Sequence, residues 1–477
     1  MGKPIVALRS AGAALTLALL AGCSMAPPYV APQLATPAPQ AFKEMGPWTP
    51  AAPADAAPRG AWWSVYGDTT LDALEGRLET GNPGLAAALA RYDQARAYAN
   101  QARSSLFPEI DASAAITRNR QSDDRPLRDG AGPNYYNNQT LGGVISYEFD
   151  LWGRVRNLVA AAKADAEASV EDLASVRLSL HAELADDYLA LRGLDAQARL
   201  LTDTAKAYQK ALDLTQLRHS GGVVSGLDVG RARTVLSSAH AALVEVGAQR
   251  ALYEHAIASL VGEPASSFSI PVVDIMPAQP QTPVAAPSVL LQRRPDVAAA
   301  ERRAYAANRQ IGVAKAAFFP SLTLDASGGF QTAGGGANLI GAGDSLWTLG
   351  PQAVLPVFDA GKRRAVAAQA RAQFDQASAD YRTTALSAFQ QVEDALALCN
   401  RLAEESRNEQ EAADAARQTE ELSLTRYQEG AVDYLEVVTA QAATLDAERS
   451  LIILNARRLQ ASVDLVKALG GGWNTPA

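Results

Sequence analysis

Two patterns in the chain could support catalysis: its histidines and one glycine-rich run. The four histidines fall in helix-like segments or in a turn and show no metal-ligand spacing; they are His181, His219, His240 and His255. The run TAGGGANLIGAG at 332–343 lacks the Lys-Ser/Thr pair and the following helix of a phosphate-binding loop, so it is expected to join two strands. We therefore predict that the chain is not an enzyme.

One residue is a candidate for covalent modification. Lys3 and Arg9 precede eleven apolar residues at 11–21, and LLAGC closes the run at 19–23. This run is too short to span a bilayer as a helix and predicts a signal peptide over 1–22. Its ending resembles the bacterial lipobox, which implies that Cys23 becomes the first residue and carries diacylglycerol and an N-acyl group such as palmitate. Ser24 implies sorting to the outer membrane; the alternative is an ordinary signal peptide with an incidental cysteine.

Composition narrows the function classes further. Of 477 residues only 6% are aromatic, and the formal net charge is −8, with both signs interspersed. Nucleic-acid binding requires clustered Lys and Arg, so no nucleic-acid partner is expected. Once Cys23 is acylated only Cys399 keeps a thiol, which excludes an internal disulfide. No cofactor is expected beyond the lipid on Cys23.

The chain contains a large internal repeat. RHSGGVVSGLDV at 218–229 returns as RYQEGAVDYLEV at 426–437, 208 positions later. Residues 82–110 match 294–322 at an offset of 212, and FDLWGRVR at 149–156 corresponds to FDAGKRR at 358–364. Self-similarity on this scale indicates one structural unit used twice. The predicted boundaries are a Pro/Ala-rich tether at 23–60, repeats at 61–262 and 294–470, a Pro-rich linker at 263–293, and a C-terminal tail at 471–477.

Each copy is predicted to contain a long helical hairpin. The last helix of each copy has a seam of small and apolar residues at three- and four-residue steps, typical of a coiled coil, in which Arg250 and Arg458 are the polar exceptions. The preceding helix begins near Val155 in the first copy and meets no proline for roughly 60 residues, about 90 Å. Gly222 and Gly430 then close the hairpins, where a left-handed residue is needed.

Four short runs alternate between apolar and polar residues. They lie at 110–118, 141–149, 322–330 and 346–358, and the last is interrupted by Pro351 and Pro356. Each has about the length of a tilted membrane strand, and Tyr147, Phe149, Trp347 and Phe358 are candidates for an interfacial girdle. A soluble sandwich has the same period, but no second sheet is available for packing. Membrane strands cannot leave open edges, and three chains are the smallest number whose barrel keeps a lumen.

Several segments together resemble the outer-membrane efflux family, the TolC-like channel proteins, in the lipoprotein branch that serves resistance-nodulation-division pumps. These are FDLWGRVR, residues 290–324, RYQEGAVDYLEVV, LVKALGGGW at 465–473 and WWSVYGD at 62–68. The resemblance implies an α+β membrane protein, a homotrimer whose twelve-stranded β-barrel, four strands per chain, continues into a long α-helical coiled-coil barrel across the periplasm. It implies a periplasmic adaptor (membrane fusion protein) and an inner-membrane resistance-nodulation-division pump as partners. The chain would passively conduct drugs or other small molecules outward through the outer membrane.

The resemblance also suggests functional residues at the two glycine turns. These turns would be the periplasmic tips that adaptor hairpins engage, with candidates Arg218, Gly222, Val224, Arg426, Gly430 and Val432. Just past the second tip, Leu435 matches a hydrophobic constriction of the family. The aspartate often found nine residues after the tip glycine is Thr439 here, which leaves Glu436 and its counterpart Asp228 as acidic gate candidates; a solvated Glu436 with no gate role is the alternative.

Two other functions stay open at this point. One is an outer-membrane duct for protein secretion of the type I kind, which shares the architecture. The other is a non-channel surface lipoprotein with a coiled-coil stalk, which would leave the membrane without detergent once Cys23 is removed. The cargo is not readable from this chain, because the pump selects it.

Overall fold

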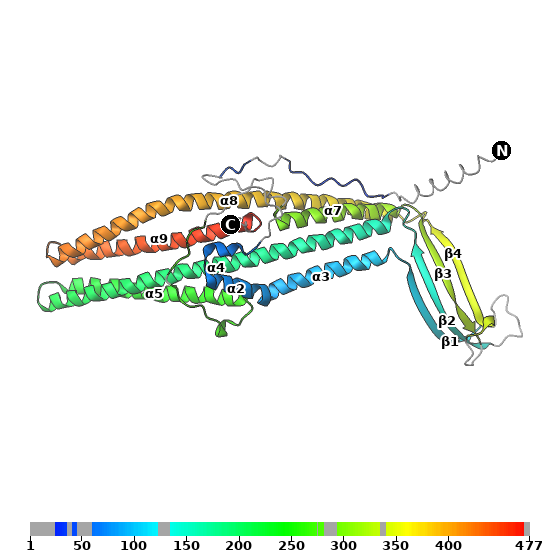
Figure 1. Ribbon diagram of the computed structural model, residues 1–477, viewed down its shortest axis with the longest axis horizontal. Helices are drawn as coiled ribbons and strands as arrows, with labels where there is room; N and C mark the ends of the chain where they lie inside the picture. The colour runs from blue at the N-terminus through cyan, green and yellow to red at the C-terminus, as the bar shows by residue number, and fades with distance from the viewer. Residues whose placement is uncertain are drawn as a thin grey trace. The chain divides into compact units, whose positions relative to one another are not determined.

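The computed structural model describes residues 24–35, 41–44, 60–122, 134–273, 275–280, 293–333 and 340–471. Its elements form two similar series (Figure 1). The first contains η1 (Trp62–Tyr66), α2 (Thr69–Gly81), α3 (Pro83–Ser104), β1 (Glu109–Arg120), β2 (Tyr135–Glu148), α4 (Arg154–Ser220), α5 (Gly226–Leu260) and η2 (Ala265–Ser267). The second contains α7 (Pro295–Ala316), β3 (Ser321–Thr332), η3 (Ala342–Asp344), β4 (Ser345–Val354), α8 (Lys362–Gln428) and α9 (Tyr434–Ala468).

The lengths of the helices confirm the duplication. Both α4 and α8 have 67 residues, and both α5 and α9 have 35. The turns that precede the two long helices also match, since Gly153 and Gly361, 208 positions apart, have φ values of 74° and 89°. The order of helix, two strands, long helix and second long helix therefore occurs twice, as the sequence predicts.

The chain divides into two compact units, and each unit takes matching parts of both repeats. The strand unit holds β1–β4 with the adjoining ends of α3, α4, α7 and α8; it covers 91–169 and 299–381, together with the chain up to Pro32. The hairpin unit holds the rest of the long helices with α2, and covers 33–90, 170–298 and 382–477. The sequence repeats and the compact units thus divide the chain differently.

The four strands form one antiparallel sheet in the order β1-β2-β3-β4. Each predicted strand is present, but β4 ends at Val354, so residues 355–358 of the fourth predicted run lie outside the strand. Pro356 explains this early end, because it cannot donate to a strand ladder. Pro351 lies in β4, which pairs on one side only; an edge strand is where a proline is tolerated, because it has no N–H to donate. Gly329 permits the close β2–β3 approach, since a Cβ there would lie 2.3 Å from the Leu141 carbonyl oxygen.

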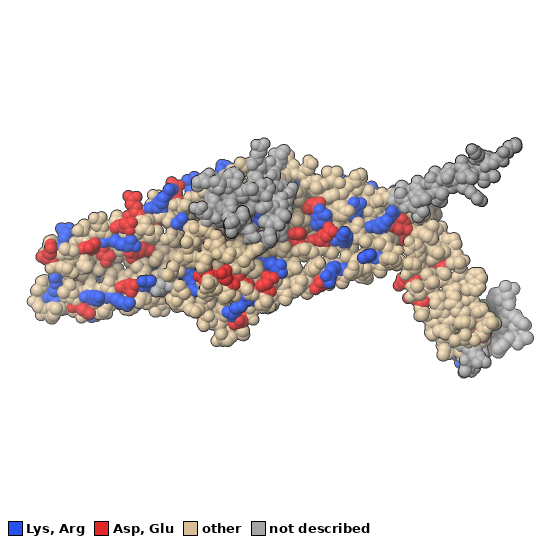
Figure 2. Space-filling view, in the orientation of Figure 1, with Lys and Arg blue, Asp and Glu red and all other residues tan. Residues whose placement is uncertain are grey.

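Large apolar side chains are exposed on this sheet. Ile110, Ile116 and Trp347 are 72%, 81% and 78% exposed. Figure 2 shows that the visible face of the strands has few charged side chains, whereas charges of both signs lie along the helices. Such a surface needs a partner or a lipid environment to cover it.

No helix in the described part of the chain is both long enough and apolar enough to cross a membrane.

The hairpin unit has a conventional apolar core. Leu71, Leu74 and Leu78, spaced to share one face of α2, pack with Tyr188 of α4 and Ile257 of α5. The helix starts cleanly because the Asp68 carboxylate accepts from the backbone N–H groups of Thr70 and Leu71, at 2.8 and 3.1 Å. This packing fixes α2 on the first hairpin.

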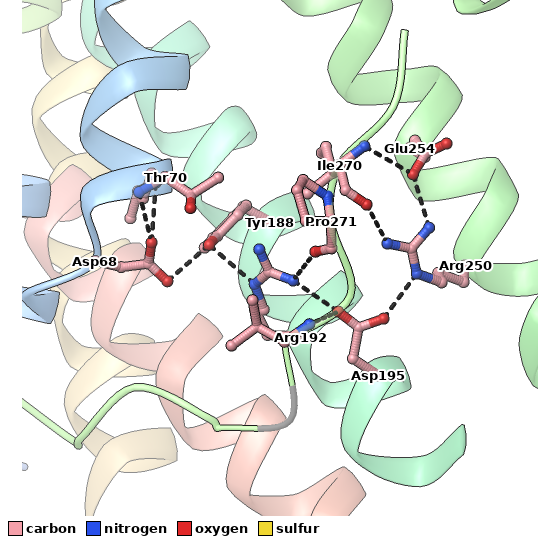
Figure 3. A network of polar contacts seen from close by, with 11 residues as sticks. Asp68, Thr70, Tyr188, Arg192, Asp195, Arg250, Glu254, Ile270 and Pro271 are labelled. Atoms are coloured by element: carbon pink, nitrogen blue, oxygen red, sulfur yellow. Dashed lines mark hydrogen bonds and ion pairs between the residues drawn. The ribbon is translucent and has the colours of Figure 1, made fainter. Parts of the chain in front are cut away.

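A buried polar network lies beside this core (Figure 3). Asp195 of α4, fully buried, accepts from Arg192 Nη1 and Arg250 Nε, each at 2.7 Å. Arg250 also donates to Glu254 at 2.7 Å and to the Ile270 carbonyl at 2.6 Å. The network therefore holds the start of the inter-repeat linker against α4 and α5, which explains the polar exception at Arg250 in the seam.

The second repeat lacks this network. The positions 208 residues after Arg192 and Asp195 are Asn400 and Ala403. Arg458, the counterpart of Arg250, instead donates to the Ser406 hydroxyl at 3.0 Å. The same seam position thus has different side-chain partners in the two copies. The second repeat contacts the linker through its backbone, since Gln279 Nε2 donates to the Arg458 carbonyl at 2.9 Å.

Candidate functional site: the hairpin tips

Both hairpin turns place a glycine in the left-handed region, as the sequence predicts. Gly222 has φ 73° and Gly430 has φ 78°. In the first turn Ser225 and Asp228 form a capping box, with the Ser225 N–H 3.1 Å from Asp228 Oδ2. In the second turn the Asp433 side chain accepts from the Glu436 N–H at 3.3 Å. Each turn therefore ends one helix with glycine and starts the next with an acidic or hydroxyl cap.

One side chain joins the two tips directly. Arg218, in the last turn of α4, donates from Nη1 to the Tyr427 carbonyl and from Nη2 to the Gln428 carbonyl, both at 3.1 Å. These carbonyls end α8, where the helix dipole attracts a cation. The guanidinium carbon also lies 4.6 Å from the centre of the Tyr427 ring. Arg218 thus ties the first hairpin to the second.

The equivalent arginine of the second repeat has a different partner. Arg426 Nη1 lies 2.9 Å from Glu436 Oε1 within its own hairpin. The two side chains are 56% and 43% exposed, so the pair is worth at most about 1 kcal/mol. Of the two predicted tip arginines, only Arg218 bridges the hairpins.

A buried cluster below the tips was not anticipated from the sequence. Tyr427 and Tyr434 are 4% and 2% exposed, and their ring centres are 5.2 Å apart. They pack with Leu236 of α5 and with Val437, and Val432 lies against the same cluster. Val432 is therefore a packing residue as well as a tip candidate. The signal available was the pair of tyrosines flanking the turn in RYQEGAVDY, where the first copy has His219 and Gly226.

The first tip carries its own exposed apolar residues. Leu217, Val223 and Leu227 are 70%, 73% and 63% exposed around Gly222. Val224, a predicted tip residue, is half-buried, and its carbonyl accepts from His219 Nδ1 at 2.9 Å. These three exposed side chains add candidates for adaptor contact to those named from the sequence.

The four gate candidates differ in how free their side chains are. Asp228 is committed to the capping box and lies 3.5 Å from Arg231 Nη1, with 16% of its side chain exposed. The Thr439 hydroxyl donates to the Leu435 carbonyl at 2.8 Å. Leu435 is 45% exposed and adjoins Glu436 in the first turn of α9. Leu435, Glu436 and Thr439 are thus exposed, with Glu436 paired to Arg426, and the role of these residues as a gate stays a prediction. Cys23, the predicted lipid attachment site, lies outside the described residues.

Comparison with known proteins agrees with this architecture. The family model described as outer membrane efflux protein matches residues 76–263 and 286–471, one match in each repeat. The antibiotic efflux pump outer membrane protein ArpC of Pseudomonas putida is 32% identical over 462 residues, which cover 96% of this chain and 95% of that protein. The pyoverdine export outer membrane protein OpmQ of Pseudomonas aeruginosa is 32% identical over 467 residues, with coverage of 96% and 95%.

A solved structure gives the same result. The outer-membrane channel OprN matches with a TM-score of 0.86 and 28% sequence identity, over 94% of this chain and 100% of that one. The match extends over both the sheet and the long hairpins, so it is not confined to a single repeat. The family expected from the sequence motifs is therefore confirmed, and this chain belongs to the outer membrane efflux protein family.

Proposed function

We propose that this chain is the outer-membrane channel of a tripartite efflux system, passing small molecules from an inner-membrane resistance-nodulation-division pump and a periplasmic adaptor to the exterior. The observation that carries the proposal is the open four-stranded sheet with exposed apolar residues, in a chain of the outer membrane efflux protein family. The edge strands β1 and β4 each pair on one side only. In lipid such edges must be closed by further copies of the sheet.

The two repeats indicate how the copies fit together. In the strand unit α7 is packed between α4 and α8: Ala306 lies against Ala161 and Ala164 of α4, and Ile311 packs near Ala370 of α8. Arg302 Nη1 adds an ion pair with Glu167 of α4 at 3.6 Å. The second repeat thus supplies a helix that fills the groove between the two long helices.

The corresponding helix of the first repeat is left uncovered. Gln94 of α3, the counterpart of Ala306 at the offset of 212, is exposed, and Tyr98 is 53% exposed. On α8, Ala372 and Asp375 correspond to Ala164 and Glu167 at the offset of 208, and both are exposed. Each chain therefore fills the space between α4 and α8 with α7. It leaves two matching surfaces exposed, one on α3 and one on α8.

A ring closes when α3 of one chain covers this α8 surface of the next. Three chains then join twelve strands, the smallest such barrel with a lumen, and bring six hairpin tips together for the adaptor. The trimer, the adaptor and the pump are the partners of this proposal. Cargo is left open, since ArpC and OpmQ are named for antibiotics and pyoverdine and have equal identity to this chain.

We also propose that Cys23 carries the lipid anchor. One experiment then distinguishes a membrane-spanning channel from a coiled-coil stalk that is held to the membrane only by its lipid. A Cys23→Ser variant should lose metabolic labelling with palmitate yet stay a trimer that needs detergent for extraction, because barrel closure supplies the main membrane affinity. Recovery of this variant as a soluble monomer without detergent would overturn the channel. Palmitate labelling of the variant would overturn the anchor alone.

A further inference from the structure

Cations gather in the strand unit where the long helices meet the strands. Arg103 and Lys315 lie in the last turns of α3 and α7. The first turns of α4 and α8 carry Arg154, Arg156, Lys362, Arg363 and Arg364, and neither has an acidic residue. Every helix that joins the sheet thus has a basic residue at its strand-proximal end.

Helix stability does not explain the cations of α4 and α8. The N-terminus of a helix favours anions, so a basic first turn opposes the dipole. Asp150 and Asp359 compensate from outside the helices: Asp150 accepts from the Val155 N–H at 3.1 Å, and Asp359 accepts from the Arg363 N–H at 3.1 Å. The caps allow the helices to start, but the charge at these positions requires another reason.

Some of these cations already have carboxylate partners. Arg154 Nε lies 2.7 Å from Glu148, and Arg363 Nε lies 2.6 Å from Asp359. Arg156 Nε lies 3.1 Å from Asp150. Four others are exposed and make no ion pair with a described residue: Arg103, Lys315, Lys362 and Arg364. We call these four residues the basic collar.

Three of the four residues of the basic collar are four positions from an exposed phenylalanine in the sequence. Arg103 precedes Phe107 by four residues, and Lys315 precedes Phe319 by four; the rings are 62% and 38% exposed. Phe358, four residues before Lys362, is 88% exposed.

We call Phe107, Phe319 and Phe358 the aromatic belt, and Phe319 is held by a stacking contact. The Trp152 ring stacks on Phe319 with centres 4.7 Å apart, and its Nε1 donates to the Pro320 carbonyl at 2.8 Å. Arg363 lies over the Phe318 ring at 5.8 Å. A belt of rings beside free cations is the arrangement found where a membrane protein leaves the acyl region and meets the headgroups.

We propose that the basic collar binds anionic phospholipids of the periplasmic leaflet, with the phenylalanine rings in the acyl boundary and Arg103, Lys315, Lys362 and Arg364 on the phosphates. The inference rests on the proposed function, which places β1–β4 in the outer membrane. Phospholipid is favoured as the occupant because the collar lies on the helical side of the sheet, the side that continues into the periplasm. The collar would set the depth of the barrel and retain a shell of anionic lipid.

The test compares wild type with R103Q/K315Q/K362Q/R364Q in nanodiscs of phosphatidylcholine with or without phosphatidylglycerol. The lipid retained per trimer after detergent release is counted by native mass spectrometry. The variant K206Q/K210Q/R401Q/R407Q removes four exposed cations elsewhere on α4 and α8 and serves as the matched control. Wild type and control should retain phosphatidylglycerol preferentially, and the collar variant should lose about tenfold or more of that preference. Added salt should also lower the wild-type preference.

The outcomes separate the collar from the channel. An unchanged preference in a collar variant that stays trimeric and conducting would overturn the collar and leave the proposed function intact. If the collar variant does not assemble, the wild-type salt titration decides, and a salt-insensitive preference would overturn the proposal. Absence of conductance in every protein, wild type included, would instead count against the proposed function.

Discussion

Arg218 lies across the two hairpin tips of one chain, with its guanidinium 3.1 Å from the Tyr427 carbonyl and its charge over the Tyr427 ring. Any opening that separates the two turns must break these contacts. The equivalent Arg426 makes no such bridge and instead pairs with Glu436 in its own hairpin. The tips of the two repeats are therefore similar in sequence, but their arginines have different partners.

Replacing Arg218 should favour the open tip. Arg218→Ala removes two charge-assisted hydrogen bonds, together worth about 2 kcal/mol or more, which corresponds to roughly a 30-fold shift in a closed–open equilibrium. Single-channel recording in planar bilayers should show higher open probability. Arg426→Ala is the control. It removes the same positive charge from the other tip, but it breaks only an exposed ion pair with Glu436, so open probability should change little. Equal open probabilities for wild type and Arg218→Ala would mean that the bridge does not restrain the tips.

The gate prediction concerns the first turn of α9. Leu435→Ala should raise conductance by widening an apolar constriction, and Glu436→Gln should lower cation selectivity with little change in conductance. Thr439→Asp should add a second acidic ring and strengthen block by divalent cations. These quantities come from current–voltage curves in asymmetric salt. If Leu435→Ala and Glu436→Gln both keep wild-type values, the constriction lies elsewhere.

The glycine turn predicts a separate loss of adaptor coupling. Gly430 has φ 78°, so Gly430→Leu strains the second tip, whereas Gly430→Asn is better tolerated because asparagine enters the left-handed region more readily. Efflux and cross-linking to the adaptor should fall for leucine and largely persist for asparagine, with trimer abundance normal in both. Normal efflux with Gly430→Leu would remove this turn from the docking site.

A pH dependence is predicted at α2, outside the strands. Burial raises the pKa of Glu75 from its ordinary 4.5 to about 7, although a hydrogen bond from His181 Nδ1 at 2.5 Å opposes the shift. The native protein then binds more protons than the unfolded chain between these pKa values. Stability should therefore fall as pH rises from about 4.5 to 7, by about 3 kcal/mol from this group. Glu75→Gln should flatten this slope, measured as the unfolding midpoint against pH.

The Glu75 prediction is tested by the difference in the pH slope of stability between wild type and Glu75→Gln. Burial also raises the pKa values of Asp186 and Asp187 to about 6, so wild type has further slope in the same range. Glu79→Gln is the matched control, because Glu79 contacts the other ring nitrogen of His181 at 3.2 Å but is 40% exposed. Identical slopes in wild type and Glu75→Gln would contradict a raised pKa at Glu75.

Much of the fold was predictable because the signals are local. Alternating residues located all four strands, and the lack of proline between Val155 and Ser220 predicted one uninterrupted helix, which the structure has. The positive φ at Gly222 and Gly430 followed from the need to stop one helix and reverse the chain.

The unpredicted features depend on which segments meet. Aligning the repeats makes Arg218 and Arg426 equivalent, but only the folded chain shows that Arg218 faces a neighbouring hairpin. The sequence did not predict the buried role of Asp195, because that role depends on ion pairs with Arg192, 3 residues away, and Arg250, 55 residues away. His181 was set aside for lack of metal-ligand spacing, and its contacts with Glu75 and Glu79 join segments more than 100 residues apart.

The central claim, that three chains close by placing α3 of one against α8 of the next, is tested most directly by a disulfide between neighbouring protomers. Gln94→Cys and Ala372→Cys, in a Cys399→Ala background, put one thiol on each exposed surface. Oxidation in outer membranes should give covalent trimers on a non-reducing gel, and either cysteine alone should not. Only monomers under the same oxidation, or cross-linking confined to single chains, would contradict the account.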